Sequence, residues 1–316
     1  MSSSQKTASP LLVIIAFATV YIVWGSTYFF IRLGELGGMP PFLLGAARFI
    51  TAGLLLMTWC IFFKGEKIFI RRDILNAAVT GLLLLLVGNG IVIWAEKTLP
   101  SAMVAILVSS APIWFVLLDK RNWAINLTNK STIIGLIIGF GGVILLFSDQ
   151  IKSIFNGDGA SKLPWMLLLI VGTISWSWGS LFSKHRPASG SASVSTAWQM
   201  LWAGVAYIPV SLIHHEFDGL NISSIQTSSW LAVTYLVIFG SIAAYNAYVW
   251  LLQVRSATQV STYAYVNPVI AVILGVVFAH ENISATQLIG LLIILLSVLL
   301  INLAKYRKEK ISLARR

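Results

Sequence analysis

Charged residues are scarce in this chain of 316 residues, where they make up only 10%. Soluble domains carry about 25% charged residues. Apolar residues account for 57% of the chain instead. A water-soluble fold of this composition would expose large hydrophobic patches, so the composition excludes an ordinary soluble domain and favours a lipid environment.

Cysteine and metal-binding motifs are also missing. The single cysteine, Cys60, excludes an intramolecular disulfide. There is no CxxC, no HExxH and no phosphate-binding GxxxxGKS/T motif, so we expect no cofactor and no metal. A net charge of +11 is a feature of nucleic-acid-binding proteins. Here the basic residues lie in short loops and not along one groove, so no nucleic-acid partner is expected.

Ten apolar segments, several close to 20 residues long, are separated by short polar linkers. A helix of about 20 residues crosses a hydrocarbon core of ~30 Å. The chain is therefore predicted to be an all-α integral membrane protein with ten transmembrane helices, surrounded by the lipid bilayer. The predicted spans are 11–33, 42–63, 74–95, 99–118, 132–148, 164–184, 196–213, 229–252, 257–279 and 285–304.

The two halves of the chain resemble each other at an offset of about 155 residues. The matched positions are Trp24-Gly25-Ser26 with Trp178-Gly179-Ser180, Trp94 with Trp250, and Pro112 with Pro268. Each half holds five spans, an odd number, so the second copy must enter the membrane from the opposite side. We therefore predict two inverted five-helix repeats, residues 1–150 and 151–316, the second with a short basic tail. Inverted repeats are typical of secondary transporters, whose halves rock about a shared site.

The basic residues divide unevenly between the predicted loops. Of the 22 Lys and Arg residues, 17 fall on one side of the predicted membrane and four on the other, while Arg48 lies inside a span. The positive-inside rule places the basic side in the cytoplasm, together with both termini.

Pro112 and Pro268 lie well inside their predicted spans. A proline there removes one backbone hydrogen bond and kinks the helix, and the freed carbonyl needs another donor. Ser109, Ser110 and Asn267 are close enough in sequence to supply one. Kinked helices at matched positions of two halves are the best sequence indicator of a transport site.

Other polar and aromatic residues inside spans are further site candidates, because a polar group in the bilayer core needs a partner or a wet cavity. The stretches around Trp24 and Trp178 have a second interpretation as helix-packing residues, and Asn89 has one as an interhelical hydrogen-bonding group. They are Trp24 and Ser26 in the first span, Asn89 in the third, Trp176 and Trp178 in the sixth, Tyr245 in the eighth, and Tyr263 and Asn267 in the ninth.

Four residues are assigned as anchors or gates: Arg48, Trp94, Glu96 and Trp250. Arg48 lies about 10 Å into the second span. It is interpreted either as an anchor that reaches the membrane surface or as a clamp for a substrate carboxylate. Glu96, beside Lys97 at the end of the third span, is interpreted as an interfacial anchor.

An integral-membrane enzyme acting on a lipid-linked substrate is the alternative function. Such an enzyme would need acids, histidines or a metal site at the membrane surface. One cluster of this kind, His214–Asp218, lies in a single predicted external loop. We interpret it as a solvated loop, which leaves the transporter as the favoured function.

Several motifs, in their order and spacing, resemble the drug/metabolite transporter superfamily, in its bacterial EamA-type branch and an exporter subgroup of that branch. The resemblance covers residues 11–304. It is carried by Trp24-Gly25-Ser26-Thr27, Ala46-Ala47-Arg48-Phe49, Gly88-Asn89-Gly90 and Ala111-Pro112, and by a matching stretch from Ala257 to Pro268.

The resemblance implies a multi-pass transporter of the cytoplasmic membrane, often an exporter, of small metabolites such as amino acids or related compounds. It implies a central cavity that opens alternately to each side, with Arg48 as a helix-end anchor near it. It leaves substrate identity, coupling ion and oligomeric state open. The lining residues that it favours are Trp24, Ser26, Asn89, Trp178, Tyr245, Tyr263 and Asn267.

Overall fold

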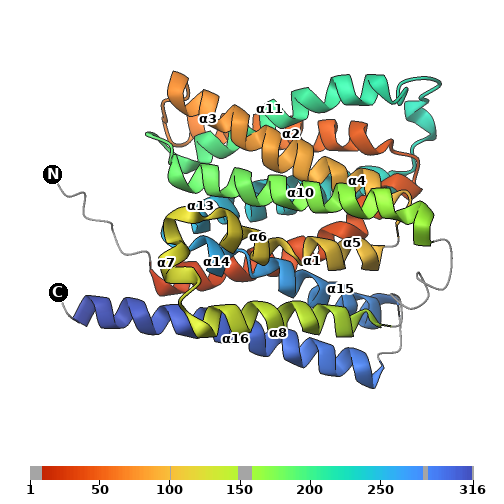
Figure 1. Cartoon of the computed structure of the whole chain (residues 1–316). Coiled ribbons are helices and arrows are strands. Elements are labelled where there is room, and N and C mark those ends of the chain that lie inside the picture. The colour runs from red at the N-terminus through yellow and green to blue at the C-terminus, as the bar shows by residue number, and fades with distance from the viewer. Residues whose placement is uncertain (1–8, 100, 149–158, 280–283, 315–316) are drawn as a thin grey trace.

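The chain forms one bundle of long helices that run between two ends (Figure 1). The computed structural model describes residues 9–99, 101–148, 159–279 and 284–314. Within these ranges the secondary structure is helical and no strand occurs. Eight of the described helices are long and apolar enough to cross a membrane, or nine if one bent pair is a single span. These observations confirm a multi-pass, all-α membrane fold.

The first part of the chain begins with two uninterrupted helices and continues with segmented ones. The elements are α1 (Pro10–Leu36), α2 (Pro41–Phe62), α3 (Arg71–Gly81), the π-helix η1 (Leu82–Gly88), α4 (Asn89–Glu96), α5 (Ser101–Val108), α6 (Ala111–Leu118), the 3₁₀ turn η2 (Lys120–Asn122), α7 (Trp123–Asn126) and α8 (Lys130–Leu146).

The second part repeats this order of long and segmented helices. Its elements are α10 (Gly159–His185), α11 (Ala192–Ile213), the 3₁₀ turn η3 (Ile222–Ser224), α12 (Thr227–Tyr235), the π-helix η4 (Leu236–Tyr245), α13 (Asn246–Val254), α14 (Ala257–Val260), α15 (Tyr263–Ala279) and α16 (Ala285–Ala314).

Two of the ten predicted spans are not among these eight helices. The predicted span 99–118 corresponds to α5 and α6, which are separated at Ser109 and Ser110, and its apolar stretch within the described residues is Val104–Leu118. The predicted span 132–148 corresponds to α8, whose axis is bent by 100° from that of the preceding short helix. Hydropathy does not record such bends, because it counts apolar residues and not the direction of the chain. The predicted boundary between the halves, at residues 150 and 151, lies outside the described residues.

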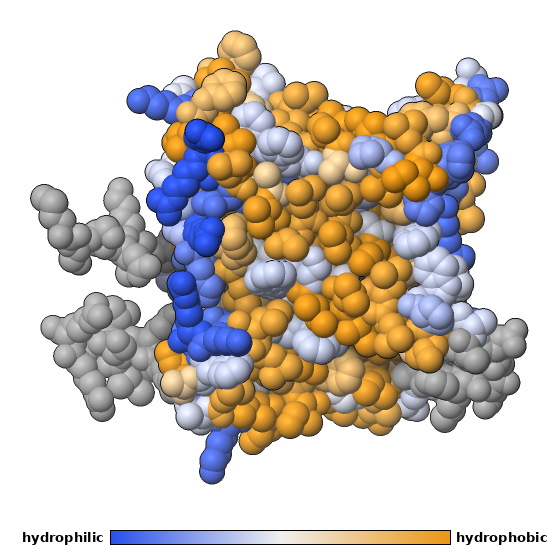
Figure 2. All heavy atoms as spheres, turned by 45° about the horizontal axis from the view of Figure 1, so that its top comes forward, coloured by the Kyte–Doolittle hydropathy of each residue, from blue (hydrophilic) through white to orange (hydrophobic). Residues whose placement is uncertain are grey.

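Hydrophilic residues gather at the two ends of the bundle and apolar residues cover the visible face between them (Figure 2). We call one end the basic end. The loops after α2, α6 and α10 lie at this end. Two of its segments are joined there, because Ser189 donates its backbone N–H to the Asp73 carboxylate. At the opposite end Gln226 donates its N–H to the carbonyl of Gly37. The described ends of the chain, at α1 and α16, lie together on the left of Figure 1, at the basic end.

The helices of one half pack largely against helices of the other. α2 lies along α11, and α8 lies along α16. α1 packs against α12, η4 and α15, whereas α10 packs against η1, α4 and α6. Each of α1 and α10 therefore packs one face against segmented helices of the other half.

Candidate functional site

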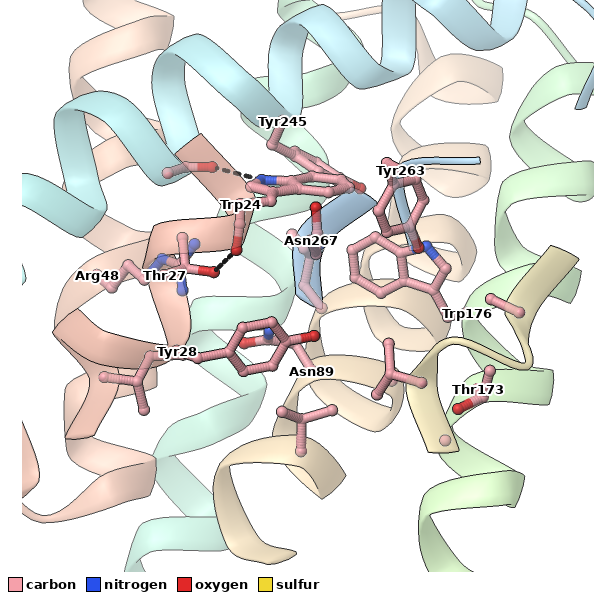
Figure 3. Close-up of a pocket in the computed structure, with 18 of the residues that line it drawn as sticks. Trp24, Thr27, Tyr28, Arg48, Asn89, Thr173, Trp176, Tyr245, Tyr263 and Asn267 are labelled. Atoms are coloured by element: carbon pink, nitrogen blue, oxygen red, sulfur yellow. Dashed lines mark hydrogen bonds between the residues drawn. The ribbon is translucent and has the colours of Figure 1, made fainter. Parts of the chain in front are cut away.

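A cavity lies at the centre of the bundle, between α1 and α10 (Figure 3). It leaves about 70 Å³ for the centres of water molecules. A single water needs about 10–15 Å³ on that measure, so the cavity accommodates several waters or part of a small molecule. Its polar and aromatic lining residues are Trp24, Thr27, Tyr28, Arg48, Phe49, Asn89, Thr173, Trp176, Tyr245, Tyr263 and Asn267.

The π-helix η1 supplies one wall of the cavity. Its wider turns change the ordinary i to i−4 bonding of the backbone, and π-helical turns are frequent at functional sites. Side chains of the second half donate to its carbonyl groups. The Tyr207 hydroxyl donates to Leu85 O at 2.7 Å, and Ser175 Oγ donates to Leu83 O at 2.8 Å. These bonds fix the wall that presents Leu85 to the cavity.

The π-helix η4 supplies the facing wall and is held in the same manner by the first half. Trp24 Nε1 donates to Gly240 O at 3.2 Å, and Arg48 Nε donates to Ser241 Oγ at 2.8 Å. Each π-helix is therefore tied to the opposite half through side-chain donors, so the two walls depend on both halves for their shape.

The interrupted helices also meet across the bundle. Pro268, inside α15, cannot donate to the carbonyl of Ala264 four residues earlier. That carbonyl accepts a bond of 2.8 Å from Ser109 Oγ, which lies at the break between α5 and α6. The sequence indicated Asn267 as the donor nearest to this proline, but the structure assigns the bond to Ser109 of the other half. Neither Pro112 nor Pro268 lines the cavity, and both lie buried behind its wall.

A cluster of aromatic rings closes the cavity towards the basic end. The ring of Trp24 lies 5.5 Å from that of Trp176, 4.8 Å from that of Tyr248 and 4.9 Å from that of Tyr263. The Tyr248 hydroxyl bonds Ser180 Oγ at 2.6 Å and accepts from Trp176 Nε1 at 3.1 Å. Edge-to-face and tilted ring contacts of this kind are each worth about 0.5–1.5 kcal/mol beyond burial. The cluster therefore forms a packed floor.

The wall above this floor carries polar groups with free bonding capacity. Asn89 and Asn267 both line the cavity, and the Oδ1 atom of each is buried without a hydrogen-bond partner among the described residues. Thr27 is satisfied locally, because its hydroxyl donates to Trp24 O at 2.7 Å. In Figure 3 the amide of Asn89 is drawn at the ring of Tyr28, and the side chain of Asn267 is drawn between Trp24 and Tyr263. The site thus combines stacking surfaces with unused amide oxygens.

Five of the predicted binding residues come together in this cavity, and Arg48, predicted as an anchor or gate, joins them in its wall. The five are Trp24, Asn89, Tyr245, Tyr263 and Asn267. Their part in binding a substrate stays a prediction.

Trp178 and Ser26 do not reach the cavity. Trp178 is 59% exposed on the outer side of α10, because it lies about 200° around the helix from Trp176, which lines the cavity instead. Ser26 is buried, and its hydroxyl bonds the Tyr235 hydroxyl at 2.7 Å. The repeat correctly marked these segments of α1 and α10 but not the direction of each side chain.

The remaining predicted anchor residues are not among the residues that line the cavity. Trp94 packs at the opposite end, with its ring 5.1 Å from those of Trp165 and His214. Glu96 ends α4 nearby, and neither of its carboxylate oxygens has a partner among the described residues. Trp250 is half-buried on α13 and packs against the apolar core.

Thr173 is a cavity residue that the sequence analysis did not name, and Trp176, named there as a candidate, is a cavity residue that the favoured lining residues left out. A usable signal was present in the sequence of α10. Thr173, Ser177, Ser180 and Lys184 recur at helical spacing and mark one polar stripe, next to Trp176. Trp178 lies off this stripe, so the stripe identifies the inward face of α10.

The residues of the His214–Asp218 loop have contacts that organise the opposite end. The Glu216 carboxylate accepts the backbone N–H groups of Phe42 and Leu43, at 3.1 and 2.8 Å, and so caps the start of α2. His214 packs against Phe42 with 4.8 Å between ring centroids. Across the described residues, no group of three or more His, Cys, Asp or Glu side chains is placed to hold a metal ion.

Comparison with known proteins agrees with this architecture. The model of the EamA-like transporter family matches residues 11–148 and again residues 163–303. The chain is 39% identical over 294 residues to the uncharacterized inner membrane transporter YedA of Escherichia coli strain K12, covering 92% of this chain and 90% of that protein. Protein PecM of Dickeya dadantii is 26% identical over 294 residues, which cover 88% of this chain and 88% of that protein. A solved crystal structure covers 95% of the chain, with a TM-score of 0.76 at 19% identity, and shows the same fold.

Proposed function

The chain belongs to the EamA-like transporter family, and on that premise we propose that it carries a small metabolite across the cytoplasmic membrane by alternating access. The broader statement, that the chain is a multi-pass membrane transporter, follows from the family and from the eight apolar helices. The central cavity is the proposed substrate site.

The proposal includes ten membrane spans arranged as two inverted repeats. The eight long helices, α8 and the broken pair α5–α6 together make up the ten segments. Three observations support the inverted repeat. One family model matches two successive stretches of the chain. A π-helix interrupts the third span of each half. In Figure 1, α1 starts at the basic end whereas α10 ends there, so the first helix of each half points the opposite way.

The proposed orientation places the basic end in the cytoplasm. Short cytoplasmic loops of membrane proteins carry an excess of Lys and Arg, and 17 of the 22 basic residues belong to this end in the ten-span topology. In that orientation the aromatic floor closes the cavity towards the cytoplasm, and transport requires the floor to open.

The observation that carries the proposal is that one cavity is lined by both halves at its centre. Trp24 and Asn89 come from the first half, and Trp176 and Asn267 come from the second. A site between two halves that move against each other is the arrangement that alternating access needs. Aromatic faces with a few amides suit a small, partly apolar metabolite such as an amino acid or a related compound, and export is the proposed direction.

The test compares two tryptophans of α10 that lie two residues apart. A thermal-shift screen of a metabolite panel on the purified protein first identifies a ligand, because a ligand that binds the folded state raises Tm by mass action. Counterflow of that ligand is then measured in proteoliposomes. Trp176→Ala is expected to lower the rate about fivefold, since stacking contributes about 1 kcal/mol.

Trp178→Ala is the matched control, because its side chain points away from the cavity. It is expected to transport at the wild-type rate at an equal protein level. Equal activity of Trp176→Ala, Trp178→Ala and the wild type would reject the cavity as the transport site.

A further inference from the structure

Arg48 is the charged residue that lines the cavity, and its surroundings are unusual for a buried charge. It lies on α2, with only 4% of its surface exposed. Figure 3 shows its side chain entering from one side, with the guanidinium nitrogens directed towards Thr27 and the other labelled cavity residues. The charge therefore lies at the cavity wall and not at the membrane surface.

The protein fixes the guanidinium through only one of its nitrogens. Nε donates to Ser241 Oγ at 2.8 Å, and the guanidinium carbon lies 4.8 Å from the centre of the Phe49 ring. Nη1 is buried without a hydrogen-bond partner, and Nη2 makes no hydrogen bond to a residue that the structure describes. Two nitrogens of the planar fork are thus left without an acceptor.

No carboxylate compensates this charge among the described residues. The ion pairs seen there, His185 with Asp119 and His215 with Asp218, do not include Arg48. A buried charge without a partner is costly, and arginines inside membrane spans are found facing cavities or paired with acceptors. A positive charge that is left unpaired in a ligand cavity attracts an anion.

Resting on the proposed function, we infer that Arg48 binds the carboxylate group of the substrate. A guanidinium held through Nε presents its remaining donors to a carboxylate in the geometry of a bidentate pair. The aromatic floor then receives the apolar part of the same molecule. The substrate class is a small organic acid with an apolar or aromatic body.

The anchor role is the competing interpretation, and the structure gives a way to separate the two. An anchor stabilises the fold, so its removal lowers Tm in the absence of ligand. An unpaired buried charge kept for binding costs stability instead, so an apolar replacement of similar length leaves Tm unchanged or raises it. Arg48→Met is the variant that tests this, because methionine keeps an unbranched apolar side chain.

The binding experiment uses three acids and their neutral amides as probes: phenylacetate and phenylacetamide, indole-3-acetate and its amide, and hexanoate and hexanamide. Thermal unfolding and quenching of tryptophan fluorescence are measured at pH 7.5 on the purified full chain. At least one acid is expected to raise Tm in a concentration-dependent way, whereas its amide does not. Arg48→Met is expected to weaken binding of that acid tenfold or more.

Two further variants serve as controls. Arg48→Lys keeps the charge but loses the planar fork, and it is expected to bind the acid with intermediate affinity. Arg121→Met removes a basic residue of the surface at the basic end and is expected to bind the acid like the wild type.

Three outcomes overturn the inference: no acid stabilises the wild type, each amide binds as well as its acid, or Arg48→Met keeps acid binding and lowers the Tm of the free protein. These outcomes leave the proposed function intact if Trp176→Ala still loses counterflow. If one of the three outcomes is found and Trp176→Ala and Trp178→Ala also show equal counterflow, the inference about Arg48 and the proposed function are both rejected.

Discussion

At the residue scale, side-chain direction decides which member of a repeated motif contributes to the cavity. Trp24 and Trp178 occupy matched positions in the sequence, yet Trp24 lines the cavity and Trp178 is largely exposed. Residues two positions apart on an α-helix point about 200° away from each other, so Trp176 can face the cavity where the matched residue, Trp178, does not. Both faces of a membrane helix can be apolar, because one faces lipid and the other faces protein. Hydrophobicity therefore cannot choose between Trp176 and Trp178.

Tyr207 shows how one buried hydroxyl supports the cavity wall. The side chain is fully buried, and its hydroxyl donates to Leu85 O in η1. Tyr207→Phe is expected to lower the free energy of unfolding by about 1–2 kcal/mol, because a buried carbonyl loses its donor. Thermal unfolding of the purified protein is the measurement, with an expected fall in Tm of a few degrees.

Thr234→Val is the control for Tyr207→Phe. It also deletes a hydroxyl, but one that is exposed and bonds within its own helix, to Trp230 O. Its Tm is expected to stay within about one degree of the wild type. A Tm of Tyr207→Phe equal to that of this control would show that η1 does not depend on the Tyr207 hydroxyl.

At the element scale, departures from regular helix occur where the two halves meet. η1 is bonded by Ser175 and Tyr207, and the break before α6 reaches α15 through Ser109. A π-helix or a proline break leaves backbone groups that need outside partners. The other half supplies these partners, so the segmented helices are features of the assembled bundle and not of any single segment.

The pair α8 and α16 shows the effect of close packing between regular helices. A Cβ atom at Gly290 would lie 2.8 Å from Leu146 N, which belongs to the backbone and cannot move aside alone. Gly290→Ala is therefore expected to destabilise the protein by about 1–3 kcal/mol through overpacking. The measurement is Tm in detergent, together with the yield of folded protein.

Gly141→Ala on α8 is the matched control, because nothing lies within 4 Å of its added Cβ atom. This variant is expected to be neutral or slightly stabilising, by up to about 1 kcal/mol, since alanine favours a helix over glycine. If both glycine variants behaved alike, contact between α8 and α16 would not be the cause.

At the scale of the whole molecule, the two ends of the bundle are proposed to face different compartments. Lys120 is exposed at the basic end, and Ser223 is exposed in the loop between α11 and α12 at the other. The native Cys60 is fully buried and is expected to give little background. In intact bacterial cells, a membrane-impermeant maleimide is expected to label Ser223→Cys and to leave Lys120→Cys unlabelled.

Permeabilised cells provide the comparison for this labelling experiment. Labelling of Lys120→Cys is expected to rise at least tenfold once the reagent can cross the membrane. The unmodified chain, with Cys60 alone, should remain unlabelled in both preparations. Labelling of Lys120→Cys in intact cells, with Ser223→Cys protected, would reverse the proposed orientation.

The sequence by itself determined that this protein lies in a lipid bilayer, and it determined the approximate positions of the long helices. The reason is that the length of apolar segments and the scarcity of charged residues can be read directly from the chain. It also brought five cavity residues into one predicted site, including Asn89 and Asn267, since polar groups inside apolar spans stand out. It did not determine the π-helices, the bend before α8 or the donor that satisfies the Ala264 carbonyl. Only the tertiary structure decided these, and with them the inward direction of Trp176 and the unpaired state of Arg48. The physical reason is that each depends on which backbone and side-chain groups of one half reach the other, and such contacts between distant segments have no local pattern in the chain.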